Sequence, residues 1–321
     1  MSDGVIEVQV HATTEVARGV LSFDLRAPDG RDLPPFTAGS HIDVHMTEGL
    51  MRCYSLVNAP SERHRYVIAV SLDANSRGGS RYLFDHPMTG QTLRVGTPRN
   101  NFALAENAPH VVLIAGGIGI TPLYCMIQRL ESLGKSWELH FGARDRASAA
   151  FRDELQALEA TKPGRVHFNF DLEDGKMLDT AAIVARTAPD AHLYCCGPLP
   201  MLEIYKAAAA GRDPDTVHIE YFAAPAVASE PASESFTVVL NSTGETFEVP
   251  PGKSILDVLL DGGVHAPFSC GAGECGSCVV EVLEGEPIHR DCVLSDNERA
   301  GGKLMMICVS GCASKKLVIE L

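Results

Sequence analysis

The first hundred residues alternate short apolar runs with turn-forming residues. The runs that read as strands span residues 6–14, 19–28, 41–46, 52–59, 65–73 and 91–96. Proline, glycine and asparagine stand between them, and several short strands at this spacing are typical of a β-sandwich or a small barrel. We therefore predict an antiparallel β-barrel domain over residues 1–103.

A different pattern begins at His110, where apolar strands alternate with helices. The predicted strands span residues 111–115, 137–143, 166–170 and 192–197, and the predicted helices span residues 123–134, 151–160 and 201–210. Strands that alternate with helices in this way are typical of an α/β domain with a doubly wound parallel sheet. We place this domain at residues 108–224.

Small and polar residues interrupt the pattern after the second domain. The segment at 223–235 reads AAPAVASEPASES, which is the composition of a linker. We place the linker at residues 225–235 and a third unit at residues 236–321. A length of 321 residues alone suggests about two domains, so the pattern raises the expected number to three.

The composition gives the chain a negative net charge. The chain has 41 acidic and 27 basic residues, which give a formal charge of -14. This sign opposes binding to a phosphate backbone, so we expect no nucleic-acid partner. Residues 232–321 contain 13 acidic and 6 basic residues, a net charge of -7, so the third unit holds half of the total.

The sequence shows no targeting or membrane signal. The start, MSDGVIEVQV, lacks the basic and apolar regions of a signal peptide. The most apolar stretch, Val111 to Ile120, is far shorter than the ~18 residues of a membrane helix. Ten cysteines are too few for a disulfide scaffold of this length. We expect a cytoplasmic monomer with no membrane contact.

Six of the ten cysteines fall in the last 52 residues. Cys270, Cys275 and Cys278 have the C-x4-C-x2-C spacing of a plant-type 2Fe-2S site, which needs a fourth thiolate downstream. We choose Cys308 as this fourth ligand, with Cys312 as the alternative. Zinc is the alternative metal, although the paired C-x2-C motifs of zinc ribbons are absent. Glycines at 271, 273 and 276 allow the loop to wrap tightly around a cluster.

Residues 236–321 resemble a plant-type ferredoxin. The resemblance rests on FTVVLNSTGETFEVPPGKSILDVLLDGGVHAPFSCGAGECGSC and on the later MMICVSGC. It implies an α+β domain of the β-grasp fold, whose cluster carries one electron. A cluster of this type has a low potential, roughly -400 mV, so its donor must be strongly reducing and must deliver electrons singly. A hydride donor cannot do this directly.

Two motifs in the predicted barrel indicate a site for a cofactor that accepts a hydride and releases single electrons. RCYS at 52–55 closes one strand, and RGGSR at 77–81 opens a short helix. A glycine pair at a helix start offers N–H donors to a phosphate, although each motif taken singly is more often structural. Together with PRNNF at 98–102 they resemble the flavin barrel of ferredoxin reductases. The implied flavin contacts are Arg52, Tyr54, Ser55, Ala69, Val70, Ser71, Arg77, Gly78, Gly79 and Ser80.

A glycine turn follows the first strand of the α/β domain. The segment LIAGGIGITP at 113–122 allows backbone to approach a pyrophosphate, although it is not a GxGxxG motif and a tight structural turn is the alternative. With the CCGP segment at 195–198, it resembles the nicotinamide domain of the same reductases. This resemblance implies that Thr121 approaches flavin and nicotinamide and that Cys196 lies beside the nicotinamide. The other implied contacts are Gly116, Gly117, Gly119 and Gly197.

Arg144 and Asp145 follow the second strand of this domain. An acidic residue at this point favours a free ribose 2′-hydroxyl, so we prefer NADH as the coenzyme. Arg144 would accommodate the 2′-phosphate of NADPH instead. Both residues are therefore predicted to lie in the coenzyme site.

The order of flavin barrel, nicotinamide domain and C-terminal ferredoxin makes the whole chain resemble the phthalate dioxygenase reductase family, including vanillate demethylase reductases. The HIEYF segment at 218–222 also fits, and it implies that Phe222 covers the flavin. Glu220 is expected to be a solvated or salt-bridged carboxylate, and assistance of nicotinamide binding is the alternative. The resemblance favours FMN over FAD, and the short segment at 83–97 shows no insert for an adenine.

The resemblance implies a reductase that passes electrons from NADH to FMN, then to the 2Fe-2S cluster, and finally to a separate Rieske-type oxygenase. That oxygenase would be an aromatic acid dioxygenase or an O-demethylase. No acid or base residue is assigned, because the cofactors supply the chemistry. Two alternatives are a flavin and iron-sulfur redox sensor, and a stand-alone flavin or quinone reductase.

Overall fold

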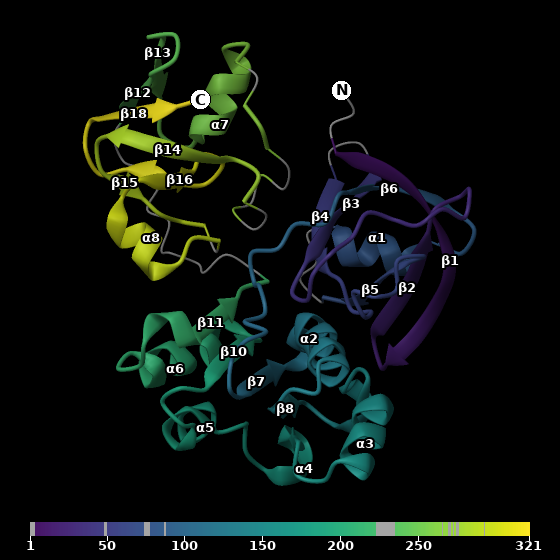
Figure 1. Ribbon diagram of the computed structural model, residues 1–321. Helices are drawn as coiled ribbons and strands as arrows, with labels where there is room; N and C mark the ends of the chain where they lie inside the picture. The colour runs from purple at the N-terminus through teal and green to yellow at the C-terminus, as the bar shows by residue number, and fades with distance from the viewer. Residues whose placement is uncertain are drawn as a thin grey trace. The chain divides into compact units, whose positions relative to one another are not determined.

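The chain folds into two compact units, Met1–Glu220 and Tyr221–Leu321 (Figure 1). The computed structural model describes residues 4–47, 50–73, 78–86, 88–222, 235–264, 266–268, 271, 273, 276–291 and 293–321. Each unit has a hydrophobic core of its own. The first unit contains both the predicted barrel and the predicted α/β domain, so these two share one compact body. Among the described helices, none is both long and apolar enough to span a membrane.

Six antiparallel strands form the barrel, in the order β4-β3-β6-β1-β2-β5 (Figure 1). They are β1 (Val5–Ala17), β2 (Val20–Arg26), β3 (His41–Thr47), β4 (Leu50–Ser55), β5 (Tyr66–Ser71) and β6 (Thr92–Gly96). An isolated bridge between Leu56 and Ile68 joins the two edge strands, so the sheet closes on itself. The predicted antiparallel barrel is thereby confirmed. Helix α1 (Gly79–Asp85) packs against β3 and β4.

A five-stranded parallel sheet follows, in the order β11-β10-β7-β8-β9. Its strands are β7 (Val111–Gly116), β8 (Trp137–Ala143), β9 (Val166–Phe170), β10 (His192–Cys196) and β11 (Val217–Glu220). The helices are α2 (Ile120–Ser132), α3 (Arg152–Thr161), α4 (Asp171–Asp174), α5 (Thr180–Arg186) and α6 (Leu199–Ala209). Every residue of β7 is buried, as a central strand covered on both faces requires. The α/β prediction is confirmed, although the sequence patterns do not predict α4 and α5.

The order of strands reverses direction between β7 and β10. From β7 the chain adds β8 and β9 on one side, and it then adds β10 and β11 on the other side. Ligands of open α/β sheets bind at the carboxyl ends of the strands at such a switch point. The glycine turn after β7 and the Cys-Gly-Pro segment after β10 both lie at this point.

Side chains from the α/β part tie it to the barrel. The ring of Tyr194 packs edge-on against Phe102 at 5.4 Å, and its hydroxyl donates to the carbonyl of Ala103 at 3.1 Å. Gln128 of α2 donates to the Val57 carbonyl at 2.7 Å. These contacts explain why one continuous core runs through the first unit.

The described residues of the second unit form a mixed sheet of order β13-β12-β18-β14-β16, a small two-stranded sheet and two helices (Figure 1). The strands are β12 (Phe236–Leu240), β13 (Thr246–Val249), β14 (Val279–Glu284), β15 (Pro287–Ile288), β16 (Leu304–Met306), β17 (Gly311–Cys312) and β18 (Lys316–Glu320). The helices are α7 (Ile255–Asp261) and α8 (Asp296–Gly301). A capping box begins each helix, built on Ser254 and on Ser295.

Candidate functional site

Ser55 and Glu220 join the end of β4 to the end of β11. The Ser55 hydroxyl donates a hydrogen bond to Glu220 Oε2 at 3.4 Å, across 165 residues of sequence. Burial raises the pKa of the Glu220 carboxyl to about 8, and the Ser55 hydrogen bond acts in the opposite direction. No cation within the described part of the chain pairs with this carboxyl. Glu220 is therefore protonated at neutral pH, whereas sequence reasoning favoured a solvated or salt-bridged carboxylate.

The other strand residues predicted for the flavin lie on β4 and β5. Arg52 and Tyr54 are half-buried on β4, while Ala69 and Val70 are buried and Ser71 is half-buried on β5. β4 contacts β5, and β5 in turn contacts η1 (Gly117–Gly119), the turn that follows β7. The fold thus brings the predicted flavin strands to the glycine turn of the α/β sheet.

The start of α1 suits a phosphate group. Gly78 has a φ of 98°, which favours glycine, and a Cβ on Gly79 would lie 2.6 Å from Cγ of Arg52. The Arg52 side chain therefore lies directly against the helix start because residue 79 has no side chain. The Ser80 hydroxyl accepts a hydrogen bond from the Asp73 N–H at 3.3 Å. Arg77, also predicted here, lies outside the described residues.

The glycine turn packs directly on the segment after β10. A Cβ on Gly119 would lie 2.1 Å from the Cys196 carbonyl oxygen, and one on Gly116 would lie 3.2 Å from the Gly197 Cα. These two glycines are thus required by contact between two loops of the protein itself. Gly117 differs, because it has a φ of 54° and open space where a Cβ would point. Its exposed backbone can face a pyrophosphate.

Thr121 and Cys196 lie on either side of the switch point. The Thr121 side chain is buried, and its hydroxyl donates to the Ile118 carbonyl at 3.0 Å. Cys196 is fully buried beside Glu220 in the strand register. Burial raises the pKa of the Cys196 thiol well above its usual value, and the charges of Glu220 and Cys195 add to the effect. Cys196 is therefore a neutral thiol and cannot act as a thiolate nucleophile at neutral pH.

Asp145 follows β8 but already has protein partners. Its carboxylate accepts a hydrogen bond from the Ser148 N–H at 3.0 Å, which caps η2 (Arg146–Ser148), and it pairs with Arg18 of the barrel. Arg144 beside it is exposed. The role of this pair in coenzyme binding stays a prediction.

Cys278 and Cys308 meet in the core of the second unit. Their sulfur atoms are 3.2 Å apart, far longer than the ~2.05 Å of a disulfide. The Gly273 backbone has a φ of 71°, and a Cβ there would lie 2.7 Å from Val309, so the loop wraps tightly only with glycine. Two thiols held together by such a loop fit the donor set of a 2Fe-2S cluster. Cys270 and Cys275 lie outside the described residues.

Cys312 occupies a different position from these two sulfurs. It belongs to β17, which pairs with β15, and its thiol donates to the carbonyl of Ser314. These contacts favour Cys308 over Cys312 as the fourth ligand. Phe222 is the second residue of the second unit and has an exposed side chain, so its predicted role over the flavin stays a prediction.

Two family descriptions match the chain. Residues 113–207 match an oxidoreductase NAD-binding domain, and residues 238–312 match a 2Fe-2S iron-sulfur cluster binding domain. The predictions of these two domain types are therefore confirmed. The match to the 2Fe-2S domain extends from β12 to β17 and includes Cys278 and Cys308.

Relatives match the chain along its whole length. The phenoxybenzoate dioxygenase subunit beta of Ectopseudomonas oleovorans is 51% identical over 98% of this chain and 97% of its own. The tetrachlorobenzoquinone reductase of Sphingobium chlorophenolicum is 50% identical over 98% of both chains. The solved structure of phthalate dioxygenase reductase, described as modular for electron transfer from pyridine nucleotides to 2Fe-2S, is 39% identical. The match covers 99% of this chain and 98% of the chain in that structure, with a TM-score of 0.73. The chain therefore belongs to the phthalate dioxygenase reductase family, as its sequence predicts.

Proposed function

We propose that the chain is the NADH-dependent reductase component of a two-component oxygenase system. Electrons pass from NADH to FMN, then to a 2Fe-2S cluster, and then to a separate terminal oxygenase of the Rieske type. The observation that carries the proposal is the Ser55–Glu220 hydrogen bond, because it joins the predicted flavin strand to the carboxyl edge of the nicotinamide sheet, one strand away from its switch point. The collinear relatives named as oxygenase subunits and reductases support it.

Both cofactors fit residues of this chain. Arg52, Gly78 and Gly79 would hold the phosphate of the flavin, and Cys278 and Cys308 would hold iron together with Cys270 and Cys275. When bound, a flavin accepts a hydride and releases its electrons singly, and a 2Fe-2S cluster carries one electron. The protein supplies position and electrostatics.

Two protein groups define the environment at the switch point. Glu220 holds a proton below about pH 8 and accepts a hydrogen bond from Ser55. Cys196 is a neutral, fully buried thiol beside it. Neither group places a negative charge at this point at neutral pH, so an incoming dinucleotide meets no additional repulsion. Water is also excluded from the buried thiol.

The proposal also includes the coenzyme, the cellular location and the partner protein. NADH is preferred because Asp145 places an acidic group after β8. The protein acts in the cytoplasm as a monomer, and its partner oxygenase takes an aromatic acid or an O-methylated aromatic substrate. The acidic second unit docks on that oxygenase.

Stopped-flow mixing of the full-length holoprotein with NADH tests the proposed function. Flavin absorbance should bleach first, and cluster absorbance should fall within the turnover time. NADPH should give a slower first phase. A cluster that stays oxidised during turnover would reject the electron-transfer chain and would favour a redox sensor.

A quinone reductase is the second candidate, because a relative at 50% identity has the name tetrachlorobenzoquinone reductase. In that case the flavin part alone reduces the physiological acceptor. A flavin-loaded Cys308→Ser protein, which lacks the cluster, should then keep its rate of quinone reduction. The oxygenase proposal instead predicts that this variant reduces dyes but loses coupled oxygenation.

A further inference from the structure

A glutamate and two histidines share one face of the parallel sheet, apart from the predicted flavin and nicotinamide contacts. Glu138 and His140 are two residues apart on β8, and His167 of β9 is the register partner of His140. Alternate residues of a strand point to the same face of a sheet, and register partners on neighbouring strands do so as well. These three side chains therefore lie on the same face. The buried Trp137 and Phe141 of β8 occupy the other face.

The ligand atoms of these side chains are close enough together for one metal ion. One atom from each side chain lies within 4.8 Å of the other two, and Glu138 Oε1 is 3.2 Å from His140 Nε2. Zinc bonds of ~2.0–2.2 Å in a tetrahedral site place two ligand atoms roughly 3.3 Å apart. The Glu138–His140 pair therefore already has the spacing of two ligands of one ion.

The ring of His167 must turn to complete this set. It lies parallel to the His140 ring, with the ring centroids 4.6 Å apart and an interplanar angle of 10°. A metal ion lies in the plane of each imidazole that binds it, so the two rings cannot stay parallel. His167 is exposed and makes no hydrogen bond with any residue that the structure describes. Rotation of its side chain therefore breaks only the stacking contact.

The Nε2 atom of His140 has two neighbours with opposite requirements. The Glu138 carboxylate, at 3.2 Å, requires an N–H donor, whereas the Arg186 guanidinium, at 3.0 Å, requires a lone pair. One ring nitrogen provides only one of these, and the His140 side chain is buried away from water. A divalent cation removes the conflict, because it accepts the lone pair of the nitrogen and also binds the carboxylate.

Arg186 is the group that such a cation displaces. It is the last residue of α5 and is exposed, and its hydrogen bonds within the described residues are to the His140 ring alone. A guanidinium that leaves this ring regains water. Two positive charges repel each other at so short a distance, so Arg186 competes with the metal ion for this position.

The carboxyl and the exposed ring have the protonation states that a metal ion requires. Hydrogen bonding with His140 lowers the pKa of the Glu138 carboxyl and outweighs the opposing effect of burial. Burial lowers the pKa of the His167 imidazole, the His140 charge adds to this effect, and the Glu138 carboxylate opposes it. At neutral pH these groups are therefore an ionised carboxylate and a neutral ring, which are the forms that bind metals.

We propose that Glu138, His140 and His167 bind one divalent cation of the zinc type, with water as the remaining ligand. Two imidazoles and one carboxylate suit Zn²⁺, whereas Mg²⁺ and Ca²⁺ prefer oxygen ligands alone. Because β9 is at the edge of the sheet, the ion also ties the edge strand to β8. This site adds a second kind of metal binding to the chain, which electron transfer does not require.

Calorimetric titration of the full-length holoprotein with Zn²⁺ at neutral pH tests the site. The loaded protein is used so that the cysteines of the cluster are not available to zinc. We expect one site with a dissociation constant on the order of 10 μM or below, because three protein ligands hold one ion. Zinc should also raise the unfolding temperature, since it binds only the folded arrangement.

Three variants test the roles of the side chains. His167→Gln and Glu138→Gln each remove one ligand and should weaken zinc binding at least ~10-fold. Arg186→Gln removes the competing charge and should strengthen zinc binding at least ~3-fold. A merely structural role of Arg186 does not predict tighter binding of a cation.

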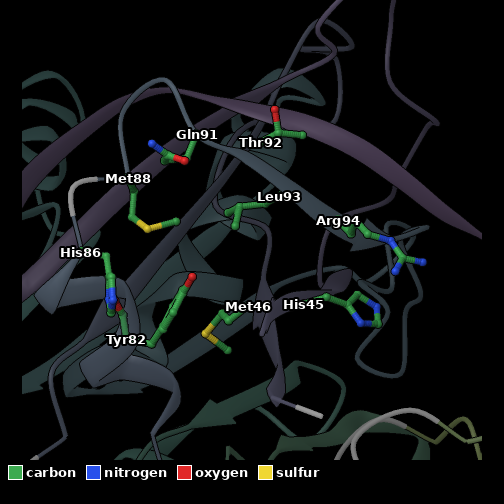
Figure 2. A pocket seen from close by; sticks show the side chains of 9 residues that line it. All are labelled: His45, Met46, Tyr82, His86, Met88, Gln91, Thr92, Leu93 and Arg94. Carbon is green, nitrogen blue, oxygen red and sulfur yellow. The ribbon is translucent and has the colours of Figure 1, made fainter. Parts of the chain in front are cut away.

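His86→Gln is the matched control. His86 is exposed like His167, and it also stacks on another ring, that of Tyr82. It lines a cavity of about 400 Å³ at the rim of the barrel, and no acidic residue lines this cavity. The other histidine of the cavity, His45, lies on the opposite side in Figure 2. The control should therefore bind zinc as the unmodified protein does.

Flavin and cluster absorbance check that each variant is folded and loaded. Weaker binding by both ligand variants, together with tighter binding by Arg186→Gln, supports the site. The proposal is overturned if the unmodified protein binds no zinc, or if both ligand variants bind zinc as tightly as the control does. Weaker zinc binding by Arg186→Gln would also contradict it.

Discussion

One buried carboxyl takes part in the contact between the two parts of the first unit. Glu220 ends the edge strand β11, and its neighbours are Ser55 of the barrel and Cys196 of the next strand. Burial favours the protonated carboxyl, because a charge in this position would lose its hydration. The same residue therefore links the stability of the protein to pH.

The free energy of unfolding should depend on pH through Glu220. Its pKa is about 8 in the folded protein against 4.5 as the ordinary value, so the folded state binds the extra proton between these limits. Stability is then fully present below about pH 4.5 and is lost as the pH rises through about 8. Glu220→Gln should remove this loss, which is on the order of 1–3 kcal/mol after allowance for partial exposure.

Urea unfolding of the holoprotein at several pH values between these limits measures the effect. Glu203→Gln is the control, because Glu203 is exposed on α6. The unmodified protein and the control should lose stability in parallel, while Glu220→Gln should change less. An identical pH dependence in all three proteins would contradict the assignment.

Two cysteines four residues apart should behave differently. Cys308 faces Cys278 at 3.2 Å, whereas the Cys312 thiol is bound to a backbone carbonyl. Cys308→Ser should lose the cluster, because one iron then lacks a thiolate. Cys312→Ser should keep it. Iron content and visible absorbance of the two purified proteins measure this, and the reverse pattern would make Cys312 the ligand.

At the scale of elements, close packing between two loops determines which residue can occupy position 119. The turn after β7 touches the segment after β10 so closely that Gly119 has no room for a Cβ. Gly119→Ala should therefore cost about 1–3 kcal/mol of stability and slow flavin reduction by NADH. In this variant the turn after β7 should move away from the segment after β10, which would change the geometry of the switch point between them.

Thermal unfolding and stopped-flow rates measure the effect of Gly119→Ala. Gly211→Ala is the matched control, because a Cβ at Gly211 would meet open space. The control should be close to the unmodified protein in both measurements. If the two variants behave alike, the close contact at Gly119 is not the cause.

At the scale of the whole molecule, charge is distributed unevenly. Residues 232–321 have a net charge of -7 out of a total of -14. Reduction of a basic acceptor such as cytochrome c should therefore slow as salt rises from ~20 to ~300 mM, because the ions screen the attraction. Flavin reduction by NADH, measured in the same buffers, should change much less. A salt-independent rate of cytochrome c reduction would argue against electrostatic docking.

Local patterns were enough to predict most elements of the first unit. Strands β1 to β6 and β7 to β10 lie where alternation and apolar runs place them, because side-chain burial depends directly on these periods. Helices α4 and α5 are not predicted, because four residues with no buried position and seven residues with three are too short to show a helical period. The Cys-x4-Cys-x2-Cys motif predicted the cluster domain because metal chemistry fixes ligand spacing.

The sequence alone determined the order of the domains, the cysteine motif and the family, since these depend on residues that are near one another in the chain. Only the tertiary structure decided which distant groups meet. It placed Ser55 against Glu220, engaged Asp145 with Arg18, and separated Cys312 from the paired sulfurs. Local sequence patterns encode secondary structure and spacing, whereas contacts across 165 or 127 residues arise only when complete sheets pack together.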